Sequence, residues 1–259
     1  METTCSLRFA SIGSGSKGNC TVVSKNGTSL LVDNGFSLKE TLRRLTALGV
    51  IPETLKGIIV THEHSDHIRG VGVLARKLGL SVWSTAGTAF QLQDEQIPDL
   101  RLFNGHEPFT VDDILISPYP VPHDAREPCQ FVFSDGHVRF GLLTDCGSST
   151  THIEKMLSGC DALMIECNHD AEMLANSNYP QVLKNRISGH QGHLSNDQAG
   201  KILDKLDCTK LQHIVAAHLS ESNNDQAVVR GQLSDNLSCK ESWIAIADQG
   251  TGLSWREIR

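Results

Sequence analysis

In the first part of the chain, apolar residues form short runs separated by turn residues, a pattern typical of strands. Strands are predicted over Leu7–Ile12, Cys20–Ser24 and Ser29–Asp33. Asn26-Gly27, between the last two, is a dipeptide that favours a β-hairpin. Apolar residues then change to helical spacing over Leu38–Leu48 and stop at Gly49. The same reasoning predicts, in chain order, a strand over Gly57–Thr61, a helix over Ile68–Leu78, a strand over Ser81–Ser84 and a helix over Thr88–Gln93.

After Gly105 the pattern of strands followed by strand–helix alternation starts again. The predicted strands are Ile114–Val121, Gln130–Ser134, Val138–Thr144, Ala162–Cys167, His213–Ala217, Trp243–Ala247 and Leu253–Ile258. The predicted helices are Ser149–Leu157 and Asn196–Leu206. Two sheet-plus-helix halves of this kind bury their sheets against each other, so we expect a four-layer αββα sandwich of the α/β class. No linker rich in Pro, Gly or Ser divides the halves, and residues 1–259 are therefore expected to form one domain.

The composition is that of a globular protein, because 39% of the 259 residues are hydrophobic and 20% are charged. No run approaches the roughly 18 apolar residues of a membrane-spanning helix. Met1–Ala10 also lacks the apolar core of a signal peptide. We therefore expect a cytoplasmic protein without a membrane partner. Eight cysteines with no CxxC pair favour buried, reduced thiols over a disulfide framework.

The net charge of −7 argues against nonspecific coating of nucleic acid or of an anionic membrane. A local basic groove remains compatible with it, because phosphate capture needs only a few cations. The candidates are Lys17, Arg69, Arg76, Lys77, Lys184 and Arg186. Twelve histidines against two tyrosines and three tryptophans are the more unusual feature, since imidazole is the commonest metal ligand. The sequence leaves the oligomeric state open.

Four potential metal ligands follow the predicted strand Gly57–Thr61 within six residues. His62 and His64 alternate, so at a strand end both imidazoles can face the same way. Asp66 and His67 come in the turn before the next helix and can reach a second point nearby. One tetrahedral zinc ion does not take four ligands from so short a segment. The segment therefore predicts a metal site, and the alternative is a solvated loop that is rich in histidine.

This HxHxDH pattern is also the signature of the metallo-β-lactamase fold, and the chain resembles that superfamily over nearly its full length. The resemblance implies three more ligands after predicted strands: His123, His218 and Asp145 as the bridging carboxylate. It also implies that Asp33 is a buried support of the histidine loop. The implied ligand set is His62, His64, Asp66, His67, His123, Asp145 and His218.

The resemblance divides these ligands between two metal ions. The first takes His62, His64 and His123, the second takes Asp66, His67 and His218, and Asp145 bridges them. Two cations about 3.5–4 Å apart can lower the pKa of a bound water and stabilise both sides of an in-line displacement. Asp66 is therefore expected to act in catalysis as well as in metal binding. Ligation by nitrogen and oxygen without cysteine fits Zn²⁺, which is our first expectation, and it also fits Mn²⁺ or Fe²⁺.

Two further stretches resemble the tRNA 3′-processing phosphodiesterases. Gly192-His193-Leu194-Ser195-Asn196 is similar to a motif whose histidine protonates the leaving oxygen, and Glu166 matches the glutamate that orients it. Cleavage of a phosphodiester expels a poor leaving group, which a tuned general acid assists. The alternative for His193 is an ordinary residue at the entry to a helix, beside the Ser195 cap.

The chain also resembles the YycJ/WalJ group of bacterial metallo-hydrolases, to which DNA 5′-exonuclease activity is attributed. The resemblance rests on Gly-Ser-Gly-Ser-Lys-Gly-Asn near the N-terminus, Asn168-His169-Asp170, the His193 motif and the residues after His218. Too few residues separate Asp145 from His218 for the inserted domain of ribonuclease J. The residues expected to bind substrate are Lys17, His169 and Ser220.

Gly13-x-Gly15-x-x-Gly18 matches the dinucleotide-binding fingerprint by its letters alone. That site requires a helix directly after the glycines, so that its N-terminus faces the pyrophosphate. Cys20-Thr21-Val22-Val23 is instead β-branched and predicts a strand. The glycines and Lys17 line the approach to the substrate or form a plain turn.

These features favour a metal-dependent hydrolase with two metal ions, a phosphodiesterase or nuclease that uses activated water. A small-molecule hydrolase of a cyclic phosphodiester, thioester or lactone on the same fold is the alternative. A third possibility is a non-catalytic scaffold, which the complete set of ligands disfavours.

Overall fold

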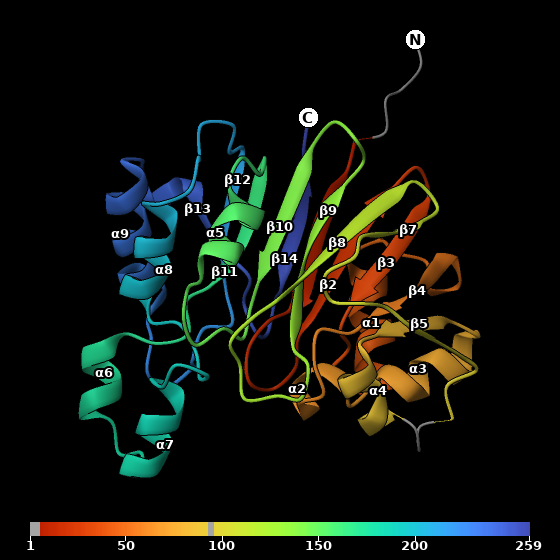
Figure 1. Cartoon of the computed structure of the whole chain (residues 1–259), viewed down its shortest axis with the longest axis horizontal. Coiled ribbons are helices and arrows are strands. Elements are labelled where there is room, and N and C mark those ends of the chain that lie inside the picture. Colours follow the sequence, from red (N-terminus) through yellow and green to blue (C-terminus); the bar gives the residue numbers. More distant parts are fainter. Residues whose placement is uncertain (1–5, 93–95) are drawn as a thin grey trace.

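Two sheets of seven strands pack face to face in the computed structural model, which describes residues 6–92 and 96–259 (Figure 1). In the order of pairing, the first consists of β14 (Leu253–Glu257), β1 (Arg8–Gly13), β2 (Cys20–Lys25), β3 (Thr28–Val32), β4 (Leu55–Ile59), β5 (Ser81–Ser84) and β6 (Asp99–Leu102). The second consists of β13 (Ile244–Ile246), β12 (His213–Ala217), β11 (Ala162–Glu166), β10 (Arg139–Leu143), β9 (Cys129–Ser134), β8 (Ile114–Pro120) and β7 (Phe109–Val111). Both sheets mix parallel and antiparallel neighbours.

Helices cover the outer face of each sheet, which completes the predicted αββα order (Figure 1). The first sheet is covered by α1 (Leu38–Ala47), α3 (Val71–Leu78) and α4 (Ala86–Leu92). The second is covered by α5 (Thr151–Leu157), α8 (Asn196–Leu203) and α9 (Gln226–Leu237). The short elements are η1 (Pro52–Thr54), α2 (Ser65–Ile68), α6 (Ala171–Asn176), α7 (Gln181–Ile187) and η3 (Glu241–Trp243).

The alternation of side chains along the strands produces these layers. In β10, Phe140 and Leu142 enter the core between the sheets, whereas Leu143 faces the helices. In β3, Leu30 belongs to the central core and Leu31 to the outer one. Each buried side chain of this size stabilises the fold by about 1.5–3 kcal/mol. A strand buried on both faces reads as a continuous apolar run, which is how these strands were predicted.

The fold agrees with the sequence-based prediction except in a few elements. The single helix predicted over Ile68–Leu78 is wrong, because the chain forms two helices there, α2 and α3, which are separated at Gly70. A Cβ atom on Gly70 would lie 1.9 Å from the carbonyl oxygen of Phe36, so the chain needs glycine there. Strands β6 and β7 and helices α6, α7 and α9 were not predicted. The end of the predicted helix at Gln93 and the first residues of the N-terminal segment lie outside the described residues.

No helix within residues 6–92 and 96–259 is long and apolar enough to cross a membrane. The cysteines of this part of the chain are free thiols, and burial raises the pKa of Cys129 and of Cys146 to about 12. Thiols with such pKa values stay protonated near neutral pH, as expected for inert structural cysteines.

Candidate metal centre

The predicted site residues meet at one rim of the sandwich, where strands of both sheets end. From the first sheet, Asp33 follows β3, and His62 and His64 follow β4. From the second sheet, His123 follows β8, Asp145 follows β10, Glu166 ends β11 and His218 follows β12. Functional residues of layered α/β proteins commonly lie at the carboxyl ends of strands, and this rim follows that rule.

Three of these residues leave their strands in the left-handed conformation. The φ angles are 61° at Asp33, 50° at Asp145 and 55° at His218. This region is uncommon for residues other than glycine, and aspartate and histidine are among the few that are enriched in it. Strained backbone of this kind persists where the surrounding structure holds it, often at functional sites. Here it turns each side chain sharply from its strand into the rim.

His62, His64 and His123 form the first potential metal-binding group, with one ring nitrogen of each lying within 4.8 Å of the others. Hydrogen bonds fix which nitrogen faces inward. The Nδ1 atom of His62 lies 2.9 Å from the Thr61 hydroxyl, and Nδ1 of His123 donates to the Gly192 carbonyl at 3.0 Å. The Nε2 atom of His62 has no partner among the described residues, and Nε2 of His123 lies 3.2 Å from Nδ1 of His64, so all three rings turn a nitrogen toward one point.

Asp66, His67, Asp145 and His218 form the second group, again with ligand atoms within 4.8 Å of one another. The His67 ring is held by the buried carboxylate of Asp33, because Nδ1 donates to Oδ2 at 2.7 Å. The opposite nitrogen, Nε2, lies 3.2 Å from Asp145 Oδ2 and 3.4 Å from Asp66 Oδ2. The second group therefore combines two imidazoles with two carboxylates.

Unpaired buried atoms test whether these groups fit metal ions. Among the described residues, His62 Nε2 is buried without a hydrogen-bond partner. Asp145 Oδ2 and His218 Nε2 are also buried, and they make only poorly aligned contacts, with His67 Nε2 at 3.2 Å and with Asp66 Oδ2 at 3.6 Å. Each such atom costs about 1–3 kcal/mol unless something satisfies it. Burial and the neighbouring His67 also hold the pKa of His62 well below its usual value, which favours the neutral imidazole that metals bind. The donor set fits divalent cations.

Glu166 lies fully buried beside both groups and makes four hydrogen bonds. Its Oε1 accepts from His193 Nδ1 at 2.8 Å and from His218 Nδ1 at 2.9 Å. Its Oε2 accepts from the backbone amides of Cys146 and Leu194, at 2.9 and 3.1 Å. Burial raises the pKa of this carboxyl, but His193 and His218 outweigh it and lower the pKa to about 2. Glu166 is therefore an ionised, fully bonded carboxylate.

The loop before α8 places His193 against Glu166. A bridge between His169 and Ser195 extends the β11 segment alongside this loop, and Ser195 caps α8 in a capping box with Gln198. The side chain of His193 is 21% exposed, so its ring reaches solvent while Nδ1 stays bonded. Burial lowers the pKa of His193, but the Glu166 carboxylate outweighs it and holds the pKa above its ordinary value.

Comparison with known proteins gives the family. The profile described as Beta-lactamase superfamily domain matches residues 28–218, which contain all seven residues of the two groups. The chain belongs to the β-lactamase superfamily. It is 36% identical over 238 residues to the exodeoxyribonuclease YycJ of Bacillus anthracis, a match that covers 90% of each chain.

Two further proteins of this superfamily are similar over nearly the whole chain. The exodeoxyribonuclease WalJ of Streptococcus pneumoniae is 32% identical over 256 residues, covering 96% of this chain and 93% of WalJ. The structure of the metallo-β-lactamase fold protein YhfI from Bacillus subtilis superposes with a TM-score of 0.76 at 19% identity, over 97% of this chain and 99% of that one. The predicted fold and family are confirmed, and the chain is a hydrolase of this superfamily.

The three residues expected to bind substrate, Lys17, His169 and Ser220, differ in how far they are exposed to solvent and in their hydrogen-bond partners. His169 is buried, and its Nδ1 has no hydrogen-bond partner among the described residues. Ser220 lies close to the rim, where its hydroxyl accepts from the Asn223 amide at 3.2 Å. Lys17 points to solvent and pairs with Glu221 at 2.6 Å, which offsets its charge. The glycines around it are followed by strand β2 and not by a helix, so the strand predicted there is confirmed.

Sequence reasoning assigned no role to Asn19, which reaches the second metal group. Its amide nitrogen donates to Asp66 Oδ2 at 3.1 Å and lies 3.1 Å from His67 Nε2. Its amide oxygen accepts from the Ser14 hydroxyl, which in turn accepts from the His218 amide at 2.9 Å. The signal was the Gly-Ser-Gly-Ser-Lys-Gly-Asn stretch, in which Ser14 and Asn19 make these contacts.

Proposed function

We propose that this protein is a phosphodiesterase with two metal ions that acts on nucleic acid, most directly as a DNA exonuclease. The observation that carries the proposal is the contact of Glu166 with His193 directly beside the two metal groups. A hydrolase of a thioester needs no such proton donor, because a thiolate leaves without a proton, whereas expulsion of a sugar alkoxide needs one. The names of YycJ and WalJ, exodeoxyribonucleases at 36% and 32% identity, support the same substrate class.

We assign the first metal ion to His62, His64 and His123, and the second to Asp66, His67 and His218, with Asp145 between them. We assign Zn²⁺ to both positions. The ligands are imidazoles and carboxylates without a thiolate, and such ligands also bind Mn²⁺ and Fe²⁺. When bound, such ions supply Lewis acidity toward a phosphate and lower the pKa of water. Asp33 serves as the support of His67 and not as a ligand.

His193 is the proposed general acid. Because Nδ1 donates to Glu166, a proton on Nε2 is available to a leaving oxygen at the exposed side of the ring. The Glu166 carboxylate raises the pKa of His193, which favours the protonated imidazole that a general acid needs. Asp66 is the more exposed carboxylate of the second group, at 21%, and we assign it to hold the attacking water by a hydrogen bond.

The substrate contacts that we propose lie on the two sides of His193. Buried His169 lies between it and helix α6, and its free Nδ1 can bond a phosphate or sugar oxygen. Ser220 follows His218 on the other side, in reach of the same rim. Lys17 contributes only if its pair with Glu221 opens, since a surface ion pair of this kind is worth about 0–1 kcal/mol.

A nuclease panel with metal analysis tests the proposal. Purified protein should contain two equivalents of a divalent metal and should cleave bis-p-nitrophenyl phosphate. It should also shorten linear DNA, single-stranded or duplex, while leaving a covalently closed circle intact. Turnover of a lactone, thioester or cyclic phosphodiester without cleavage of any nucleic acid would show a small-molecule hydrolase instead. Cleavage of the closed circle would contradict the exonuclease assignment.

A further inference from the structure

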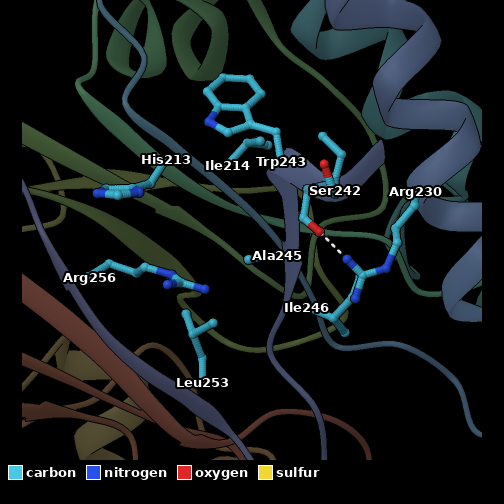
Figure 2. Close-up of a pocket in the computed structure, with 10 residues that line it drawn as sticks. His213, Ile214, Arg230, Ser242, Trp243, Ala245, Ile246, Leu253 and Arg256 are labelled. Carbon is cyan, nitrogen blue, oxygen red and sulfur yellow. Dashed lines mark hydrogen bonds between the residues drawn. The ribbon is translucent and has the colours of Figure 1, made fainter. Parts of the chain in front are cut away.

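A pocket of about 390 Å³ lies between β13 and β14, the edge strands of the two sheets (Figure 2). Its walls come from β12, α9, η3 and both edge strands. The volume falls in the range of small-molecule sites, which begins at about 300 Å³. His213 at this pocket begins β12 and His218 follows its end, so the strand separates the pocket from the metal centre by roughly 16 Å. The pocket is therefore distinct from the candidate metal centre.

Two arginines enter the pocket, Arg230 from α9 and Arg256 from β14 (Figure 2). Within the described residues, Arg256 makes no side-chain hydrogen bond or ion pair, and no aspartate or glutamate lines the pocket. Among the same residues, the side chain of Arg230 donates only to the carbonyl of Ile244. A guanidinium carries five N–H donors, so most donors of both groups have no acceptor in the part of the chain that the structure describes.

This lack of counter-charge is notable in a chain with a net charge of −7. Several other arginines pair with carboxylates, as in the contact of Arg186 with Asp124 at 2.7 Å, and Arg139 instead donates to two backbone carbonyls. Both pocket arginines are only partly exposed, which makes an unpaired charge more costly than at a free surface. Two guanidinium groups that share a pocket without acids match an anion with several oxygens, because the forked donors bind phosphate in pairs.

An aromatic surface lies at the opposite side of the same pocket. Trp243, at the junction of η3 and β13, is 37% exposed, and Figure 2 shows its indole and the Arg256 guanidinium on opposite sides of the pocket. Ser242 adds a hydroxyl between the tryptophan and Arg230. Stacking of a base on an aromatic side chain contributes about 1–3 kcal/mol.

We propose that this pocket binds a mononucleotide. Arg230 and Arg256 hold its phosphate, and Trp243 stacks on its base. A nucleoside lacks the phosphate that the arginines bind, and inorganic phosphate lacks the base that stacks on the Trp243 indole. The ligand needs no metal ion, because both phosphate-binding groups belong to the protein.

Calorimetric titration of the metal-loaded protein with deoxyadenosine monophosphate tests this site. The variant Arg256→Gln should weaken binding at least tenfold, and the matched control Arg259→Gln should leave it unchanged. Arg259 carries the same charge three residues further on but pairs with Glu257 and does not line the pocket. Deoxyadenosine and inorganic phosphate should each bind at least tenfold more weakly than the nucleotide.

Tryptophan fluorescence places the ligand within the protein. The nucleotide should quench the wild-type signal, and Trp243→Phe should remove that quenching while Trp83 and Trp255 remain. The variant Arg256→Lys keeps the positive charge but loses the paired N–H donors of the guanidinium, so it should bind the nucleotide with intermediate affinity. If Arg256→Gln lowers the melting temperature, the comparison with Arg256→Lys replaces it as the test. Equal affinity of wild type and Arg256→Gln, or of phosphate and nucleotide, would overturn the proposal.

Discussion

His218 Nδ1 donates a hydrogen bond to Glu166 Oε1 at 2.9 Å, the same oxygen atom that accepts from His193 Nδ1 at 2.8 Å. One carboxylate thus positions a proposed metal ligand and the proposed proton donor together. The sequence suggested only the second of these contacts. Carboxylates behind metal-binding histidines set the tautomer of the ring and increase its basicity, and Asp33 has the same relationship to His67.

The first prediction concerns Glu166→Gln. The side chain of the introduced glutamine has one acceptor oxygen where Glu166 has two. Either the two histidines or the two backbone N–H groups therefore lose their hydrogen-bond partner. We expect a 10–100-fold loss of affinity for the second metal ion, the usual effect of removing such a support. The rate should fall even at saturating metal, since His193 loses its charged partner. Metal titration followed by assay at saturation measures both effects.

Glu172→Gln is the matched control for this change, because Glu172 lies exposed in the first turn of α6. It should retain the metal affinity and rate of the wild type. If Glu166→Gln lost rate but bound both metal ions normally, the contact with His218 would have no role in metal binding.

The second prediction separates His193 from the metal ligands. His193→Ala should keep both metal ions and lose roughly 10²–10⁴-fold in the rate of DNA cleavage, the typical contribution of a positioned acid. The loss should be much smaller for bis-p-nitrophenyl phosphate, whose leaving group departs without a proton. Metal content and the two rates together give the answer.

Two results would contradict this assignment of His193. A lost metal ion would make it a ligand, since His193 also lies in a potential metal-binding group with Asp145, Glu166 and His218. An equal loss for good and poor leaving groups would make it a substrate-positioning residue. In that case His169 is the next candidate for the proton donor.

The third prediction is that Asp145→Asn removes metal binding and activity together. Asparagine tolerates the left-handed conformation at φ 50°, so the variant changes the charge with little backbone strain. The buried Oδ2 is the proposed bridge, and a neutral amide cannot replace a carboxylate between two cations. Asp112→Asn is the control, since Asp112 has a φ of 49° and an exposed side chain. Two metal ions bound to Asp145→Asn would exclude the bridging role.

The strands that build the rim were predictable, because each is a short apolar run followed at once by a polar residue with metal-binding chemistry. His62, Asp145 and His218 illustrate this, since each follows a run that is buried on both faces. The sheet pairing brings these ends together, and it also places β14 beside β1, although these strands lie at opposite ends of the chain. The strands and the residues at their ends are therefore readable from local sequence, whereas the order of the strands is not.

Helices α6 and α7 were not predictable for a physical reason. They bury almost nothing, with Leu174 the buried residue of α6 and none in α7, so no apolar period marks them. Helix α9 has Val229 and Leu233 at helical spacing, but Gly231 and Ser234 interrupt the apolar face. The link between Glu166 and His218 was equally hidden, because it joins residues 52 positions apart through a contact that only the sheet register creates.

The last prediction concerns the support of His67 by Asp33. In the variant Asp33→Asn, the amide tolerates φ 61° and its oxygen can still accept from the Thr61 amide, which Asp33 binds at 2.8 Å. Its nitrogen then faces His67 Nδ1, so that Nδ1 must accept and the ring proton moves to Nε2, the proposed ligand atom. We therefore expect a 10–100-fold loss of metal affinity at the second group. The free energy of unfolding of the chelated protein should fall by about 1–3 kcal/mol, because a buried charged contact is lost. Denaturant titration with and without chelator measures both, and Asp112→Asn again controls for the backbone. A variant that lost stability but bound the second metal ion normally would show that Asp33 supports the loop without setting the His67 tautomer.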